Sequence, residues 1–592
     1  MSVLSVFSTG HPAGVSPIFK KLGSALAAAA LVACGGGGGT VAELSKPAAD
    51  DDSRSKALAV SSAVMPPPVT QSDAVRLADQ ATFGSTEPLI STIRSQGIEA
   101  WLAAQLAATG SVYSSGEGDL IHTQQNANFC STRPANCWVT WYSSEPLLWD
   151  FYRNAVTQPD QLRQRMAWAL SQIVVISNLE IDGTYGYRYF HNNLLNNALG
   201  NYRSVLQRTA LSPLMGQYLN HVNNDKAKPN ENFARELLQL FAIGTCKLNL
   251  DGSLESGRCL PSYDNATVRN YAYALTGWTF PAGGSAAWGC WPAGANCTYL
   301  NGDMVARLAQ ADAQPRALLS GVNVAAGRTP DQALASVLDS LMNHPNMAPF
   351  IGRQLIQHLV KSNPSPAYVT RVATAFRSGR YTGSTRTFGS GVNGDLAATV
   401  AAVLLDAEAR IAAPTVAEKL REPVLMMTGV LRALNGRTDG EALGFWWGQE
   451  LRQHLFRAPS VFSHYPPNYP VSGTNLVGSA FGIYNVSSAL SRLNFINQLV
   501  VWGGVAPAGG VVGGTGTQVD LAPFLADAAD PARLVDRFIN LATGGRMSAT
   551  SRQAIVTAVS AWTPTSSAAW QLERVRTAAY LVLVSPAYQV LN

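Results

Sequence analysis

Charged residues are scarce in this 592-residue sequence. Asp, Glu, Lys and Arg make up 14% of the chain, and the formal net charge is +5 with no run of basic residues. We therefore expect no nucleic-acid partner, because such partners are recognised by clustered positive charge. The hydrophobic fraction, 47%, is that of a globular protein, and the length is enough for one large core or two ordinary ones.

The common catalytic and metal-binding motifs are also missing. The sequence contains no HExxH, GxSxG or CxxC, which argues against a zinc protease, a serine hydrolase of the usual kind and a CxxC metal or redox site. A GxGxxG occurs at 389–394, but it follows a Ser/Thr/Arg loop and not an apolar strand, so it predicts no dinucleotide site. His221, Asn223, Asn224 and Asp225 match no metal spacing, and loop capping is their ordinary role. We predict no metal site, and the sequence assigns no cofactor.

The N-terminal region resembles the signal of a bacterial lipoprotein. Lys20 and Lys21 precede a short apolar segment, 22–33, which ends in Leu-Val-Ala before Cys34 and a run of glycines. This pattern predicts a signal peptide over 1–33 and a lipid-modified (diacylglycerol and palmitate) Cys34. Gly follows Cys34 where Asp would mark inner-membrane retention, so we expect an outer-membrane lipoprotein, facing the periplasm or the cell surface. Residues 34–70 read as a flexible tether.

The other six cysteines fall in neighbouring pairs along the chain. Six cysteines allow fifteen pairings, and the short intervals favour the sequential one. We therefore predict three local disulfides in an oxidising compartment: Cys130–Cys137, Cys246–Cys259 and Cys290–Cys297.

Helical spacing dominates residues 71–592, which we expect to form one mainly α, multi-helix globular domain with long irregular loops and minor β-hairpins. Apolar residues recur every three or four positions from Leu162 to Ile173, and the same pattern returns from Ile351 to Leu359. Asp395 stands where an N-cap belongs before the apolar run that starts at Leu396. No repeat of 20–50 residues supports a solenoid.

Several blocks along the chain are similar to those of one family. The stretch 230–241, Asn-Glu-Asn-Phe-Ala-Arg-Glu-Leu-Leu-Gln-Leu-Phe, resembles the signature helix of the bacterial family called domain of unknown function 1800. The supporting blocks follow in family order: Ala81-Thr82-Phe83-Gly84, Ala274-Leu275-Thr276-Gly277-Trp278-Thr279-Phe280, His344-Pro345-Asn346, Lys419-Leu420-Arg421-Glu422-Pro423 and Ala458-Pro459-Ser460-Val461-Phe462.

This resemblance implies an exported, helical protein with no assigned reaction. It also implies a co-exported, sulfatase-like protein as a possible partner, since members of the two families are often encoded together. Tyr273 stands where the family usually has Arg, which weakens any role for a cation at that position.

The signature helix supplies three candidate catalytic residues. Glu231 and Arg235 are four residues apart in the order that favours an ion pair, and Glu236 lies on the same polar side. A helix-capping and salt-bridge network is the ordinary interpretation. The alternative is a polar pocket in which Glu236 acts as acid or base and Arg235 binds an anion.

His464 and five tryptophans complete the candidates. His464 lies in a loop rich in proline and aromatic residues and is the fourth possible catalytic group. The tryptophans occur in glycine-rich loops, where an indole can stack on a sugar ring, although a core position is equally expected. The candidate ligand-binding residues are Trp278, Trp288, Trp291, Trp446 and Trp447.

The leading functional expectation is a cell-envelope lipoprotein that binds or assembles an extracellular polymer, such as a glycan, or a surface complex. One alternative is an enzyme acting on an extracellular polysaccharide or other polymer, and the sequence does not decide whether the protein is an enzyme. Another is a structural partner of the sulfatase-like protein. Titratable groups gathered in one cleft would favour catalysis, and an open aromatic surface would favour binding.

Overall fold

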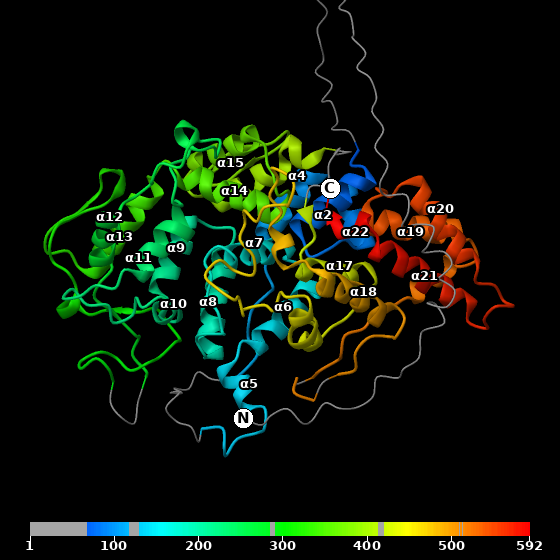
Figure 1. Ribbon diagram of the computed structural model, residues 1–592, viewed down its shortest axis with the longest axis horizontal. Coiled ribbons are helices and arrows are strands. Elements are labelled where there is room, and N and C mark those ends of the chain that lie inside the picture. Colours follow the sequence, from blue (N-terminus) through cyan, green and yellow to red (C-terminus); the bar gives the residue numbers. More distant parts are fainter. Residues whose placement is uncertain are drawn as a thin grey trace, which may run out of the picture.

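Helices are the main secondary structure of the molecule, as the sequence predicts, and the strands of the described residues form only small two-stranded sheets (Figure 1). The computed structural model describes residues 68–117, 129–284, 290–411, 419–507, 509–511 and 513–591. The expected signal peptide, Cys34 and most of the tether lie outside these residues. None of the helices in the described ranges is long and apolar enough to cross a membrane.

The α-helices vary from single turns to four turns in length. They are α2 (Gln71–Ala81), α3 (Glu87–Gln96), α4 (Ile98–Ala107), α5 (Cys137–Tyr142), α6 (Glu145–Thr157), α7 (Gln161–Ser171), α8 (Thr184–Asn197), α9 (Tyr202–Leu211), α10 (Pro213–Tyr218), α11 (Asn232–Glu236), α12 (Asn265–Ala274), α13 (Pro330–Met342), α14 (Met347–Leu359), α15 (Pro366–Ser378), α16 (Leu396–Leu405), α17 (Pro423–Ala433), α18 (Val486–Val500), α19 (Pro531–Thr543), α20 (Ala549–Ser560), α21 (Trp570–Val584) and α22 (Pro586–Gln589).

Shorter helices of other types and two-residue strands join them. The π-helices are η1 (Leu237–Ala242) and η6 (Ala442–Gly448), and the 3₁₀ turns are η2 (Glu255–Gly257), η3 (Leu308–Gln310), η4 (Leu319–Gly321), η5 (Ala407–Arg410), η7 (Ser479–Ile483) and η8 (Ala522–Asp527). The strands pair as β1 (Trp278–Thr279) with β2 (Val305–Ala306), β3 (Arg316–Ala317) with β4 (Asn323–Val324), β5 (Tyr381–Thr382) with β6 (Thr387–Phe388) and β7 (Lys419–Leu420) with β8 (Val590–Leu591), all antiparallel.

Local sequence explains where many of these helices begin. The Asp395 carboxylate accepts the backbone N–H of Ala398 at 2.8 Å, so the predicted N-cap of α16 is confirmed. At α13, Thr329 and Gln332 form a reciprocal capping box. These caps satisfy backbone donors that the first helical turn leaves without partners.

One continuous apolar core runs through the molecule, from Ala74 in α2 to Tyr588 in α22. Figure 1 shows α9 to α13 at one end of the molecule and α19 to α21 at the other, with α6, α7 and α17 between them. The first described helix, α2, packs on α19 in the C-terminal part of the chain, and β8, at the C-terminal end, pairs with β7. Buried Arg421 reinforces this junction by donating to both carboxylate oxygens of Asp79, at 3.1 and 3.2 Å.

All three predicted disulfides form, with the predicted pairing: Cys130–Cys137, Cys246–Cys259 and Cys290–Cys297. Each disulfide closes a short loop and does not link helices that are distant in the sequence. Such loops are held more tightly than their glycine- and serine-rich sequences alone would allow.

Candidate binding cleft along helix α8

Helix α8 carries an unusual set of side chains. Its fourteen residues include three tyrosines and four asparagines. Asparagine is a poor helix former because its amide competes for backbone hydrogen bonds. A helix this rich in asparagine therefore points to a use for the amides beyond helix formation.

An extended segment, residues 111–117, crosses the helices next to α8. It is fixed at its start by Asp160, whose carboxylate accepts the N–H of Ser111 at 3.1 Å and the Ser111 hydroxyl at 2.5 Å. Further along, the Asn192 side chain pairs with the backbone of Tyr113. Its Oδ1 accepts the Tyr113 N–H at 3.0 Å and its Nδ2 donates to the Tyr113 carbonyl at 2.9 Å.

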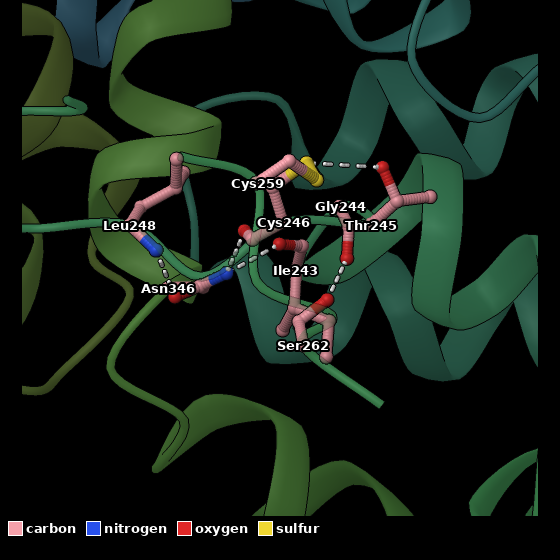
Figure 2. The surroundings of a disulfide bond; sticks show 8 residues. All are labelled: Ile243, Gly244, Thr245, Cys246, Leu248, Cys259, Ser262 and Asn346. Atoms are coloured by element: carbon pink, nitrogen blue, oxygen red, sulfur yellow. Dashed lines mark hydrogen bonds between the residues drawn. A yellow bond between two sulfur atoms is a disulfide. The ribbon is translucent and has the colours of Figure 1, made fainter. Parts of the chain in front are cut away.

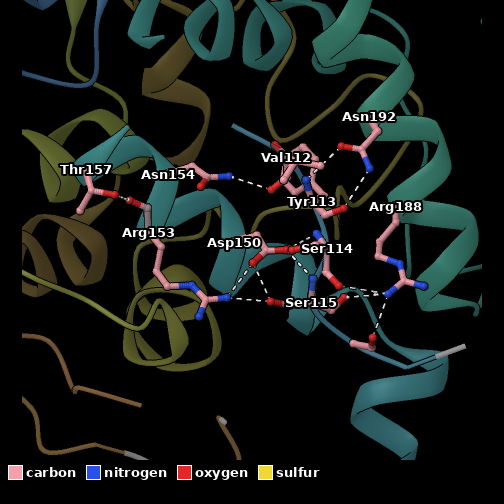
Figure 3. A network of polar contacts seen from close by, with 11 residues as sticks. Val112, Tyr113, Ser114, Ser115, Asp150, Arg153, Asn154, Thr157, Arg188 and Asn192 are labelled. Carbon is pink, nitrogen blue, oxygen red and sulfur yellow. Dashed lines mark hydrogen bonds and ion pairs between the residues drawn. The ribbon is translucent and has the colours of Figure 1, made fainter. Parts of the chain in front are cut away.

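Asp150 of α6 fixes the middle of this crossing segment (Figure 3). Its carboxylate accepts the backbone N–H groups of Ser114 and Ser115 at 2.6 and 2.7 Å, and the Ser115 hydroxyl at 2.6 Å. Arg153 balances the charge by donating to Asp150 at 2.6 Å. The ion pair therefore serves to hold the backbone in place.

Arg188 of α8 completes the attachment from the other side (Figure 3). Its Nη1 faces the carbonyls of Ser114, Ser115 and Gly116 at 3.3, 3.4 and 2.8 Å. Gly116 has φ +90°, and a Cβ there would lie 2.6 Å from the Thr184 side chain. Glycine is thus required where the segment passes the start of α8.

A cleft of about 430 Å³ opens between α8 and this segment. That volume lies within the range of about 300–1,000 Å³ found for ligand sites. The lining residues are Tyr113, Ser114, Tyr185, Arg188, Tyr189, Asn192, Asn193, Asn196 and Asn301.

The cleft is elongated along the helix. Tyr185, Tyr189 and Asn193 follow one another at intervals of four residues, so they form a row on one side of α8. From Tyr185 to Asn196 the helix rises roughly 16 Å at 1.5 Å per residue. An elongated row of polar groups suits a chain better than a single compact molecule.

The tyrosine hydroxyls in the cleft remain protonated at physiological pH. Burial raises the pKa of Tyr113 and of Tyr185, and the charge of Asp150 raises that of Tyr113 further. For Tyr189, burial and a 2.8 Å hydrogen bond from its hydroxyl to Asp303 both raise the pKa. Each hydroxyl therefore stays neutral, and that of Tyr189, which donates its proton to Asp303, can still accept a hydrogen bond.

The signature helix lies outside the α8 cleft, and it is not α-helical along its whole length. Arg235 donates to Glu231 at 2.9 Å, which confirms the predicted pair, and Arg269 approaches Glu231 at 3.7 Å. The α-helical part ends at Glu236, and η1 continues as a π-helix. Such π turns often mark functional positions in helices, and hydrophobic spacing alone does not predict them.

Glu236 takes no part in the ion pair between Glu231 and Arg235. Burial raises the pKa of Glu236, while Arg235 acts against that shift from a distance. Its Oε2 has no hydrogen-bond partner among the described residues. The three candidate residues of this helix are thus a surface ion pair, Glu231 with Arg235, and one separate half-buried carboxyl group.

The end of the signature helix is fixed by a neighbouring block of the chain (Figure 2). The Asn346 amide donates to the carbonyls of Ile243 and Cys246 at 2.9 and 2.8 Å, and accepts the N–H of Leu248 at 3.0 Å. The disulfide between Cys246 and Cys259 closes the loop beside it. This corner is therefore a structural junction.

A second concentration of polar groups surrounds Glu422, deep in the core. Glu422 is 0% exposed. It accepts hydrogen bonds from Trp168 Nε1 at 3.1 Å, Gln453 Nε2 at 2.7 Å and the Tyr465 hydroxyl at 2.5 Å. Protein groups thus supply the hydrogen bonds that a buried carboxylate needs.

Candidate residue His464 lies beside this Glu422 cluster. Burial lowers the pKa of His464 to about 4, and Glu422 acts in the opposite direction. Two cations face the same carboxylate: Arg165 and Lys419, each of which donates to the carbonyl of His358, at 3.0 and 2.5 Å. The cluster gathers titratable groups inside the core, whereas the nine residues that line the α8 cleft include no histidine and no carboxylate.

The candidate tryptophans separate into buried and exposed groups. Trp278 is 2% exposed and Trp447 is 5% exposed, so both are core residues. Trp291 is 86% exposed on the Cys290–Cys297 loop, and Trp446, at 44%, stacks on Trp447. Trp288 lies outside the described residues, and none of the nine described residues that line the α8 cleft is a tryptophan.

A larger hollow, of about 790 Å³, lies between α3 and α19. Two of its three ionic groups are paired with each other, since Arg537 donates to Glu87 and also to Asp527, each at 2.8 Å, and the third, Arg94, donates to the backbone carbonyl of Val69 at 3.3 Å. The contacts of Arg537 tie α19 to α3 and to η8. We therefore regard the α8 cleft, whose amides and hydroxyls line open space, as the better candidate binding site.

Sequence reasoning overlooked the cleft, although one signal was available. Four asparagines and three tyrosines crowd into the span of α8, where better helix formers would be expected if only helix stability mattered. The crossing segment gives no comparable signal, since its partners Asp150, Asp160 and Asn192 lie more than thirty positions away.

Comparison with known proteins gives a family and nothing more specific. A family model described as a protein of unknown function, DUF1800, matches residues 76–590. No curated protein and no solved structure matches the chain.

Proposed function

The chain belongs to the DUF1800 family, and from that premise we propose that it is a cell-envelope lipoprotein that binds an extracellular polymer through the α8 cleft. The observation that carries this proposal is the elongated row of amide and hydroxyl groups along α8. Its outer wall, the crossing segment, is held by Asp150, Asn192 and Arg188 before any ligand arrives. Such preorganisation reduces the entropy lost on binding.

The titratable candidates support binding over catalysis. His464 adjoins a cluster whose central carboxylate, Glu422, is engaged by protein donors on both oxygens. General acid–base catalysis needs a titratable group within reach of the substrate. The nine lining residues include no histidine and no carboxyl group, and the raised pKa of each of the three tyrosines keeps its hydroxyl from acting as a base near neutral pH.

The envelope location rests on the N-terminal sequence and on the cysteines. The apolar segment before Cys34 and three local disulfides both suit an exported protein. We expect Cys34→Ala to abolish lipid attachment and to leave the protein unprocessed or in the soluble fraction. Unchanged processing and membrane partition of this variant would contradict the lipoprotein assignment.

Polymer retention tests the cleft directly. Immobilised full-length protein is incubated with the extracellular polymer fraction shed by the cells that make it. Asn196 is exposed in the cleft, and its side chain has no hydrogen-bond partner in the part of the chain that the structure describes. Removing one neutral hydrogen-bonding group should weaken retention by about five- to tenfold in Asn196→Ala.

A matched control is available on α18. Asn494 is also exposed, also helical and also without a side-chain partner among the described residues. Asn494→Ala should retain polymer as the wild type does, and neither variant should change stability by more than about 0.5 kcal/mol. No retention by the wild type, or equal retention by both variants, would overturn the proposal.

A second candidate function, an enzyme that acts on the same polymer, has one observation in its favour. Glu236 is a half-buried carboxyl group with a raised pKa at an α-to-π junction, and perturbed carboxyl groups are candidates for general acids. Release of shortened chains by the wild type, abolished in Glu236→Gln, would support this candidate. Intact polymer after prolonged incubation would exclude it.

A further inference from the structure

The charge around the α8 cleft narrows the class of ligand. Resting on the function proposed above, we infer that the cleft takes an uncharged, polyhydroxylated chain, a neutral glycan, in preference to an acidic polymer or a peptide. The inference uses the charges in and near the cleft, the hydrogen-bonding character of its side chains and the placement of its aromatic rings.

An acidic polymer would need cations that the cleft does not supply. Arg188 is the one charged side chain among the nine lining residues, all of which belong to the described part of the chain. Its Nη1 is directed at three backbone carbonyls of the crossing segment. A polymer with a carboxylate or sulfate on each unit is normally bound by several arginines or lysines whose guanidinium or ammonium groups reach the anion.

The charges next to the cleft are internally balanced. Behind the crossing segment, Asp150 pairs with Arg153. At the outer edge, Asp303 pairs with Arg208 and also accepts the Tyr189 hydroxyl. These two pairs therefore add no net charge beside the cleft that would attract a charged ligand.

The remaining lining groups match the hydroxyl groups of a sugar. A hydroxyl both donates and accepts, and so does an asparagine amide or a protonated tyrosine. The side chains of Asn196 and Asn301 make no hydrogen bond within the described residues, so both amides are available to a ligand. A peptide backbone would instead be expected to pair with an exposed strand edge or to lay an apolar face into an apolar groove.

Tyrosine rings supply the apolar part of the surface. Tyr113 contacts His191 edge to face with the ring centroids 6.0 Å apart, and the Tyr189 hydroxyl donates to Asp303 at 2.8 Å, so both half-buried rings are held by neighbours. Rings fixed in this way can pack against the C–H face of a sugar at little entropic cost. The mixture of fixed rings and amides is the chemistry expected for a neutral glycan.

Chemical fractionation of the retained polymer tests this inference. The extracellular fraction is passed over an anion exchanger, and the flow-through and the bound material are each offered to immobilised full-length protein. Portions are also treated with periodate, which cleaves vicinal diols, with protease or with nuclease. Binding is measured at low and at high salt, for the wild type, Asn196→Ala and Asn494→Ala.

We expect the ligand in the flow-through, destroyed by periodate and spared by protease and nuclease. Its binding should be insensitive to salt and about five- to tenfold weaker in Asn196→Ala only. A ligand that binds the exchanger and is released from the protein by salt, or one destroyed by protease or nuclease, would overturn the inference while polymer binding stands. Absence of any ligand for the wild type would overturn the proposed function itself.

Discussion

The α8 cleft and the Glu422 cluster are both rich in polar side chains, yet they use them in opposite ways. Around Glu422, donors from Trp168, Gln453 and Tyr465 are directed at one carboxylate inside the core. Along α8, amides such as those of Asn196 and Asn301 line open space. Both oxygens of Glu422 accept hydrogen bonds from protein groups, whereas the side chains of Asn196 and Asn301 have no partner among the described residues.

We therefore assign the polar contacts of Glu422 to the stability of the fold and the amides of the α8 cleft to recognition of a ligand. A buried charge is tolerated only when protein groups replace its water, so each contact of Glu422 stabilises the fold. An amide at the surface contributes little to folding and keeps its hydrogen bonds for a ligand. Substitutions in the two regions should therefore affect different measurements.

The largest effect is expected at Glu422. In Glu422→Gln the amide loses the charge that faces Arg165 and Lys419, and it presents a donor to groups that already donate. The free energy of unfolding should fall by about 3–5 kcal/mol, as measured by urea denaturation. Glu255→Gln, at an exposed site with no side-chain partner in the described ranges, is the control and should match the wild type. An equally small change in the free energy of unfolding of Glu422→Gln would contradict the distinction between the two regions.

Acid should reproduce the Glu422 effect in the wild type. Neighbouring cations and hydrogen bonds lower the pKa of Glu422 from 4.5 to about 2. A carboxyl group with a depressed folded-state pKa stabilises the fold above its unfolded pKa, and that contribution is lost as pH falls through the folded value. The stability difference between the wild type and Glu422→Gln should therefore shrink between about pH 5 and about pH 2. A constant difference over this range would rule out the assigned ionisation.

An intermediate effect is expected at Asp150, where folding and binding meet. Asp150→Asn keeps the size of the side chain but places a donor near the N–H groups of Ser114 and Ser115. The free energy of unfolding should drop by about 1–3 kcal/mol, and polymer retention should weaken further than this loss of folded protein explains.

Asp251 offers a matched control for that substitution. Its carboxylate also accepts a backbone N–H and a hydroxyl, both from Ser253, at 2.9 and 2.6 Å. Asp251→Asn should leave retention unchanged. Equal loss of retention in both variants would mean that the crossing segment has no special role in binding.

The smallest effect is expected at Glu236. Because burial raises its pKa, the charged form is disfavoured in the folded protein, and the fold loses stability as pH rises from the unfolded pKa of the group. Glu236→Gln should remove that penalty and raise the melting temperature slightly at neutral pH, by an amount equivalent to less than about 1 kcal/mol. A marked drop in the melting temperature would show that the carboxylate has a stabilising partner.

Local features of the structure could be predicted from the sequence. Helical spacing places α7, α14 and α16, because an apolar side of a helix must face the core wherever the chain packs. The ion pair of Glu231 with Arg235 and the disulfides also follow from short spacings, since neighbouring residues meet without knowledge of the fold.

Both polar regions depend on contacts that spacing does not encode. Trp168 meets Glu422 across 254 positions, and Ser111 meets Asp160 across 49. The signature helix shows the same limit, since its pattern predicts a continuous α-helix with Glu236 in a salt-bridge network. The structure instead has a π turn there, and Glu236 Oε2 has no hydrogen-bond partner among the described residues. The asparagine content of α8 is the one feature of the sequence that points to the cleft.

Hydroxyl-radical footprinting of the full-length protein, with and without the polymer that it retains, tests the central claim most directly. It reports on tyrosines and tryptophans together, and so compares the cleft with the exposed indoles in one experiment. We expect the polymer to slow oxidation of Tyr113 and Tyr189 and to leave Trp291 and Trp446, both exposed away from the cleft lining, unchanged. Protection of Trp291 or Trp446 with no change at Tyr113 and Tyr189 would place the polymer elsewhere and contradict the assignment of the α8 cleft.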